Sequence, residues 1–399
     1  MSVKTVVGFI AAGTAVAFFT LLGVGLDDLY KKSFITPSGQ SASIAEATAS
    51  ASYGFGEHKN LLVVNITEIG GVDNIDLKDK EHATMKMYVD GEIKHNLDIG
   101  IEIKGRRDRK KLNYGIEIWE PDGDGWDDSK AKLIGDEKYE DWILRGGFFE
   151  PTLIRDKFAA DSPREGDAKY NAELFELVFC NNGKCTYEGV YLLMEEPDRK
   201  MLEKTLGWKA KIGVDGKTNC DDGDKSNTPY SESAVFFEYT VQEHKTHQCG
   251  PDHIYPEYPK CKDLLATPQC AAFYEYHKDL YEAINTGNVE VLDIPAFAER
   301  FLFEMLMSSD DFPFASQFYY SAPKSNKLTP APPYDYDGFW WRSYTGVSST
   351  AQRPIEFVNR WYYQKDLAPL WKKLATYAPF IEEVKKLEGH VTELNTKFQ

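Results

Sequence analysis

The sequence has little of what marks several common protein classes. Lysine and arginine total 46 against 63 aspartates and glutamates, a net charge of −17, so the chain lacks the basic excess that generic DNA or RNA binding requires. The GxSxG and HExxH motifs of serine hydrolases and zinc proteases are absent. A mean hydropathy of −0.46 excludes a multi-span membrane protein. Apolar side chains, at 42% of the chain, are nevertheless sufficient for a sizeable core, which excludes wholesale disorder.

Long hydrophobic runs are also scarce, and the single one lies at the N-terminus. Residues 5–26 carry no charge and would form a helix about 33 Å long, enough to cross a bilayer. Lys4 precedes the run and Asp27 and Asp28 follow it, which favours a cytosolic N-terminus. We therefore predict a single-pass anchor at 1–26. A cleaved signal peptide is the alternative, although its apolar region is usually shorter. Both interpretations place residues 27–399 in a lumenal or extracellular space.

The six cysteines agree with an oxidising compartment. Cys180 and Cys185 flank Asn182-Gly183, a tight-turn sequence, so they could bridge across a hairpin. The other four lie between 220 and 270, and the even total allows up to three disulfides. Asn65 begins a sequence that could accept a glycan.

The pattern along the chain predicts an α+β protein with two lobes. Residues 27–58 are rich in Ser and Ala and predict a flexible stalk, and residues 59–399 form the globular part. A β-rich N-lobe is predicted at 59–200, a Cys-rich insertion at 207–262 and an α-rich C-lobe at 263–399. The strands are expected at 61–69, 83–89, 97–105, 113–119, 141–145, 174–179, 189–194, 234–242, 317–321 and 333–337, and the helices at 151–160, 264–284, 294–307 and 354–397.

Two groups of charged residues are candidates for chemistry. Residues 104–111 (KGRRDRKK) concentrate basic side chains in an acidic protein and could hold phosphate oxygens; a solvated hairpin tip is the alternative. Asp310 and Asp311 end an apolar helix pattern, and Asp335 and Asp337 stand two apart among aromatic residues. Such carboxylates suit Mg²⁺ or Mn²⁺, or else belong to an acidic loop. Together the two groups fit phosphoryl transfer, which requires cations on the phosphates and a metal held by aspartates.

The same segments resemble the CotH kinase family, the spore-coat-protein-H-like proteins with an atypical protein-kinase-like fold. The resemblance covers about residues 95–340. Its blocks are 100–118 (GIEIKGRRDRKKLNYGIEI), 142–160 (WILRGGFFEPTLIRDKFAA), 175–195, 297–320 and 333–337.

The resemblance implies a role for individual residues. Asp310, or its neighbour Asp311, matches the catalytic aspartate, and Asp335 and Asp337 match the metal-binding pair. For the nucleotide phosphates, the matching residues are Lys111 or Lys110, with Arg106 nearby and Glu195 as a carboxylate that would orient the lysine. Gln317 stands where the family usually has an asparagine that binds the second metal.

The implied function is that of an ATP-dependent kinase with Mg²⁺ or Mn²⁺, placed in the secretory pathway or at the cell surface. Its acceptor would be a Ser, Thr or Tyr hydroxyl of a secreted or surface protein; no nucleic-acid partner is expected. Because Gln317 departs from the family pattern, a catalytically weak or inactive surface adhesion or coat protein is the alternative. Transfer of another group from ATP, such as AMP, is a third.

Overall fold

The computed structural model describes residues 41–42, 60–162 (except 78, 106, 108, 109 and 149), 169–206, 233–240, 253–258, 268–307, 312–336 (except 314) and 369–387. They have a mixed α/β structure that divides into two compact units after Met201. Among the described residues, no helix is long and apolar enough to cross a membrane. The apolar run at 5–26, most of the predicted stalk and most of the Cys-rich insertion lie outside them.

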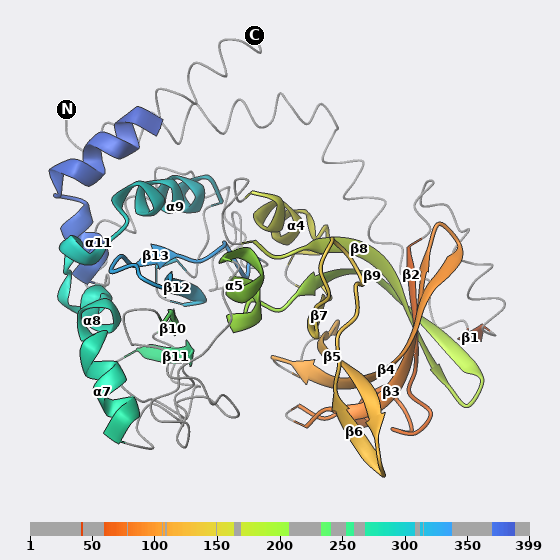
Figure 1. Ribbon diagram of the computed structural model, residues 1–399. Helices are drawn as coiled ribbons and strands as arrows, with labels where there is room; N and C mark the ends of the chain where they lie inside the picture. The colour runs from red at the N-terminus through yellow and green to blue at the C-terminus, as the bar shows by residue number, and fades with distance from the viewer. Residues whose placement is uncertain are drawn as a thin grey trace, which may run out of the picture. The chain divides into compact units, whose positions relative to one another are not determined.

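The unit before residue 202 is built on one large sheet that closes on itself (Figure 1). Strand β8 pairs in parallel with β2 and antiparallel with β9, so β9, β7, β5, β4, β3, β2 and β8 form a closed circuit. Closure leaves no unpaired edge around the barrel. The strands are β1 (Ser41–Ala42), β2 (Leu61–Asn65), β3 (Glu81–Val89), β4 (Glu92–Lys104), β5 (Asn113–Asp122), β6 (Gly125–Asp128), β7 (Asp141–Arg145), β8 (Ala172–Asn181) and β9 (Lys184–Glu195), with a short helix η1 (Val72–Asn74) between β2 and β3.

Alternation along these strands explains the barrel core. In β5, Tyr114, Ile116 and Ile118 face one side and are buried together. The alternating apolar residues of β2, β3, β4, β7, β8 and β9 join them in one cluster. Leu61 and Val63 of β2 belong to a second cluster with Val178, Cys180 and Cys185. Because both faces of β2 are covered, its residues from Leu61 to Val64 are continuously apolar.

The hairpin between β8 and β9 is closed by a turn and by a disulfide. Asn182 and Gly183 both have positive φ angles, 50° and 78°, as a two-residue type I′ turn requires. Cys180 and Cys185 face each other in the register and are joined by a disulfide. The predicted bridge is therefore confirmed. The side chains of the other four cysteines lie outside the described residues.

The second unit contains a smaller antiparallel sheet of order β11-β10-β12-β13. Its strands are β10 (Val235–Tyr239), β11 (Ile254–Tyr258), β12 (Gln317–Ser321) and β13 (Thr329–Pro330), and its helices are α7 (Pro268–Tyr276), α8 (Lys278–Thr286), η3 (Val289–Val291), α9 (Ile294–Met307) and α11 (Pro369–Leu374). Residues 378–387 are also helical. Aromatic residues pack the helices on the sheet: Tyr319 of β12 stacks on Phe297 of α9, which contacts Trp371 of α11.

Several predicted elements differ from the structure; the segment expected to be helical at 354–397, for example, contains two helices, α11 and residues 378–387, separated by residues 375–377. The helix expected at 151–160 is α4 (Ile154–Asp161), since Pro151 lies in a turn before it. The single helix expected at 264–284 is two helices, α7 and α8, because His277 between them has a non-helical ψ of 13°. Residues 331–336 do not form the expected strand. Pro332 and Pro333 lack the N–H groups that a strand ladder needs.

Candidate functional site

The structure places five of the predicted site residues. Lys110, Lys111 and Glu195 belong to the barrel unit, and Gln317 and Asp335 belong to the second unit. Arg106, Asp310, Asp311 and Asp337 lie outside the described residues. The roles given to these nine residues remain predictions.

Lys111 occupies a narrow slot at the end of the basic loop. Its Nζ atom donates to the carbonyl oxygen of Val190 at 2.6 Å and lies 4.6 Å from the centroid of the Tyr191 ring. Gly146 forms another wall, since a Cβ atom there would lie 3.1 Å from Cγ of Lys111. Burial lowers the pKa of the Lys111 ammonium to about 8, against the opposing effect of the Glu188 carboxylate. The site therefore holds a poorly solvated cation, which an anionic phosphate would stabilise.

Glu195 is held by a different partner. Its carboxylate is fully buried and accepts hydrogen bonds from Asn171, at 2.8 Å from the backbone N–H and at 3.0 Å from Nδ2. Lys111 contacts Val190 and Tyr191 instead. The two side chains thus do not form the orienting pair that the family resemblance implied.

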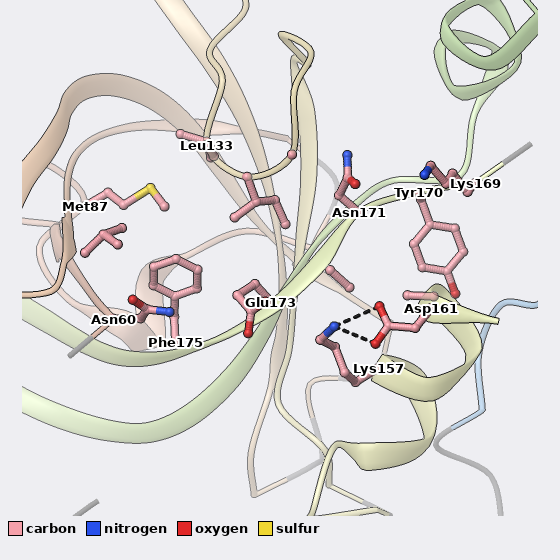
Figure 2. A pocket seen from close by; sticks show the side chains of 15 residues that line it. Asn60, Met87, Leu133, Lys157, Asp161, Lys169, Tyr170, Asn171, Glu173 and Phe175 are labelled. Atoms are coloured by element: carbon pink, nitrogen blue, oxygen red, sulfur yellow. Dashed lines mark hydrogen bonds and ion pairs between the residues drawn. The ribbon is translucent and has the colours of Figure 1, made fainter. Parts of the chain in front are cut away.

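Asn171 also lines a pocket of the barrel unit (Figure 2). The pocket has a volume of about 510 Å³. It lies between helix α4, the loop at 133–135 and the adjoining ends of β3 and β8. Met87, Leu133 and Phe175 supply apolar walls, and the ion pair of Lys157 with Asp161, at 2.7 Å, lies at its polar side. Glu195 is connected to this pocket through Asn171.

A buried ion pair that the sequence prediction missed joins β7 to α4. Nε of Arg145 lies 3.8 Å from Oδ2 of Asp156, and the two side chains are 6% and 3% exposed. A cation on a strand paired with a carboxylate on the adjacent helix is the arrangement that kinases use to order their nucleotide site. The available sequence signal was an arginine that ends a buried apolar strand.

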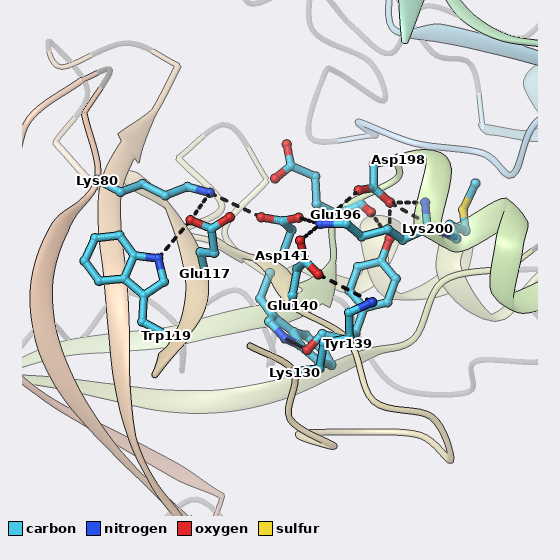
Figure 3. Close-up of polar contacts among 12 residues, drawn as sticks. Lys80, Glu117, Trp119, Lys130, Tyr139, Glu140, Asp141, Glu196, Asp198 and Lys200 are labelled. Atoms are coloured by element: carbon cyan, nitrogen blue, oxygen red, sulfur yellow. Dashed lines mark hydrogen bonds and ion pairs between the residues drawn. The ribbon is translucent and has the colours of Figure 1, made fainter. Parts of the chain in front are cut away.

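A second network of charges connects the barrel to α5 (Arg199–Leu206) (Figure 3). Carboxylate oxygens of Glu117, Glu140 and Asp141 lie within 4.8 Å of one another. Lys80 bridges Glu117 and Asp141 at 3.1 and 3.2 Å, and Lys200 of α5 contacts Glu140 and Asp141. Burial raises the pKa of Asp141 to about 7. A cation could bind here only by displacing the lysines, so the network is best understood as an anchor for α5.

Asp335 in the second unit has an unusual backbone conformation. Its φ angle is 67°, and its Oδ2 accepts a hydrogen bond of 3.2 Å from the hydroxyl of Ser316, whose own φ angle is 53°. Positive φ angles at non-glycine residues are uncommon, although aspartate tolerates them better than most, and they are enriched at functional sites. The half-buried carboxylate is a hard oxygen ligand of the type that Mg²⁺ and Mn²⁺ prefer.

Both polar atoms of the Gln317 side chain form hydrogen bonds within the protein. Its Oε1 atom accepts from Nη2 of Arg300 at 3.1 Å, and its Nε2 atom donates to the carbonyl of Ala315 at 3.0 Å. A guanidinium beside Oε1 repels a metal cation, so this geometry does not fit the metal role predicted for Gln317. That role would require the side chain to leave both partners.

A family model described as CotH kinase protein matches residues 101–394, most of the chain. No curated protein matches the chain.

Proposed function

The chain belongs to the CotH kinase family, and we propose that it is an ATP-dependent protein kinase. Membership supports a kinase-like protein, and the finer assignment rests on Asp335. Its positive φ angle, its hydrogen bond from Ser316 and its position in the Tyr-Asp-Tyr-Asp segment are those of a carboxylate held for a ligand. This observation carries the proposal.

In this proposal, different residues of the chain bind the metal, bind the phosphates and orient the acceptor hydroxyl. Asp335, with Asp337, would hold Mg²⁺ or Mn²⁺, which neutralises charge on the transferred phosphate when it is bound. Lys111 would bind phosphate oxygens, with Lys110 and Arg106 as the other nucleotide-binding candidates. Asp310, or Asp311, would orient the acceptor hydroxyl and accept its proton.

We further propose that the acceptor is a Ser, Thr or Tyr hydroxyl of a secreted or surface protein. The apolar run at 5–26 would anchor the chain or direct its secretion. The Cys180–Cys185 disulfide fits an oxidising compartment. Asn65 is exposed, as a glycan acceptor must be.

The test is label transfer by the full-length chain. Wild type with ATP labelled at the γ-phosphate and Mn²⁺ should label itself or Ser-, Thr- and Tyr-containing peptides. Asp335→Asn should reduce transfer by about 100-fold or more, and so should Asp337→Asn and Asp310→Asn. Glu382→Gln is the control, because this carboxylate is exposed in the same unit. Equal transfer by wild type and Asp335→Asn would refute the proposal, and transfer of an α-label would indicate AMP as the group moved.

The engaged side chain of Gln317 favours a second candidate, an inactive surface adhesion or coat protein. If a metal ligand is missing, nucleotide binding should be weak. A ligand that binds the folded state raises its stability by RT ln(1 + [L]/Kd). An unchanged melting temperature in millimolar ATP with Mn²⁺ would support the inactive protein, and a rise that is lost in Asp335→Asn would support the kinase.

A further inference from the structure

Helix α9 carries a buried ion pair. Nε of Arg300 lies 2.6 Å from Oε1 of Glu304, one helical turn later, and the two side chains are 5% and 0% exposed. Removing two charges from water is costly, and replacing such a pair by apolar residues often leaves stability unchanged or higher. Stability alone therefore gives a poor account of this pair.

The pair connects three segments of the second unit. Nη1 of Arg300 donates to the carbonyl of Ala331 at 2.9 Å, and its Nη2 donates to Gln317 at the start of β12. The hydroxyl of Tyr336 donates to Oε1 of Glu304. Helix α9, which leads to the predicted catalytic aspartates, is thus tied to the segments on either side of β13.

The residues held by the pair are the neighbours of the two positive-φ residues. Ser316 precedes Gln317, and Asp335 precedes Tyr336. Tyr336 is 2% exposed, so its side chain points into the core. The hydrogen bond between Ser316 and Asp335 therefore joins two positive-φ residues whose following residues are both fixed by the same ion pair. Such conformations persist only when the surrounding structure holds them.

We infer that Arg300, Glu304 and Tyr336 are positioning residues that hold Asp335 in the conformation in which it binds a divalent cation. The inference rests on the proposed function, because it assigns a ligand to Asp335. Partners of metal ligands commonly change affinity by about 10- to 100-fold when they are removed.

The decisive variant is Tyr336→Phe, which removes one hydroxyl. Its control is Tyr281→Phe in the same unit, because the Tyr281 hydroxyl is buried without a hydrogen-bond partner. Mn²⁺ binding to the full-length chain is measured from the electron paramagnetic resonance signal of free Mn²⁺, and unfolding is followed by circular dichroism. Tyr336→Phe should weaken Mn²⁺ binding about tenfold or more, with no more than the small fall in melting temperature that the loss of one buried hydrogen bond causes, while Tyr281→Phe binds as wild type. Glu304→Gln, which keeps an acceptor for Tyr336 and loses the charge opposite Arg300, should weaken binding as well.

Two results would overturn the inference: wild-type affinity in Tyr336→Phe, or Mn²⁺ binding by wild type that does not depend on Asp335. If only the proposed kinase function is wrong, the result is different. Wild type and Tyr336→Phe would still differ in Mn²⁺ affinity, but neither would transfer phosphate. If phosphate is transferred, Tyr336→Phe should raise the Mn²⁺ concentration that gives the half-maximal rate. The rate at saturating Mn²⁺ should fall by a smaller factor. A general loosening of the fold would not separate these two effects.

Discussion

The ammonium of Lys111 lies over the ring of Tyr191, with Nζ 4.6 Å from the ring centroid. The aromatic face and the Val190 carbonyl replace part of the water that a free lysine would have. These contacts do not fully replace the lost water, so burial lowers the pKa of the Lys111 ammonium.

Lys111 should make stability rise with pH in the alkaline range. Its pKa falls from 10.5 to about 8 on folding because burial disfavours the charged form. Between these values the unfolded chain binds more protons than the folded one, so the free energy of unfolding increases with pH. We expect wild type to gain stability relative to Lys111→Gln between about pH 8 and about pH 10 in urea unfolding. The exposed neighbour provides a control, Lys110→Gln, and a pH-independent difference between wild type and Lys111→Gln would contradict the prediction.

The Arg145–Asp156 pair should be essential for the barrel unit. Asp156→Ala leaves a buried guanidinium without its carboxylate, and the expected loss is about 3 kcal/mol in the free energy of unfolding. Lys157→Ala, one residue along α4, breaks an ion pair with Asp161 whose side chains are 26% and 58% exposed. It should cost about 0.5 kcal/mol or less. Denaturant unfolding of both variants checks the contrast, and similar losses would argue against a special role for Asp156.

The Cys180–Cys185 bridge should resist alkylation. Both residues are buried, at 2% and 1% exposure, and the bond closes a short hairpin. Mass spectrometry after alkylation without reductant should find the two cysteines linked and unlabelled. Replacing both by alanine should lower the free energy of unfolding by about 2 kcal/mol. Recovery of either residue alkylated from the unreduced protein would exclude the bridge.

His82 should make the free energy of unfolding fall as pH rises near neutral pH, which is the opposite of the effect expected for Lys111. Burial alone would lower its pKa, but hydrogen bonds from its ring nitrogens to Glu68 and Asp98, at 2.7 and 2.9 Å, raise it. These contacts stabilise the fold fully below pH 6.5, and the stabilisation is lost as pH rises through the raised pKa. His82→Phe keeps a ring against Trp126 and should abolish this decline. In His95→Phe, which loses a contact to a carbonyl, the decline should persist.

Sequence patterns predicted the helices and strands better than the way in which the strands pair. The apolar spacing of α9 gave both ends of that helix correctly, and β7 and β12 were also predicted with their observed bounds. The parallel pairing of β2 with β8 was not predicted, because it joins residues 115 positions apart and leaves no local signal. The strand expected at 333–337 does not form, because Pro332 and Pro333 cannot donate the hydrogen bonds of a strand ladder.

The candidate site shows the same division. The metal-binding role of Asp335 remains a prediction made from its neighbours in the sequence, whereas its contact with Ser316 depends on how two loops meet. Lys111 lies beside Tyr191, which is four residues from Glu195 on strand β9. Four residues of a strand span about 13 Å, so Lys111 is too far from Glu195 to form an ion pair with it. Arg300 and Glu304 did leave a signal, two opposite charges one turn apart inside an otherwise apolar helix.

The closed circuit of the barrel sets an order in which the chain can fold as it is synthesised. Strands β2 to β7 are made first and form a sheet with two open edges, β2 and β7. Only the hairpin of β8 and β9 occupies both edges, so the barrel cannot close before residue 195 has left the ribosome. Until then the nascent chain exposes strand edges that a neighbouring chain could join. The turn at Asn182-Gly183 thus helps to end the period in which the nascent chain is prone to aggregation.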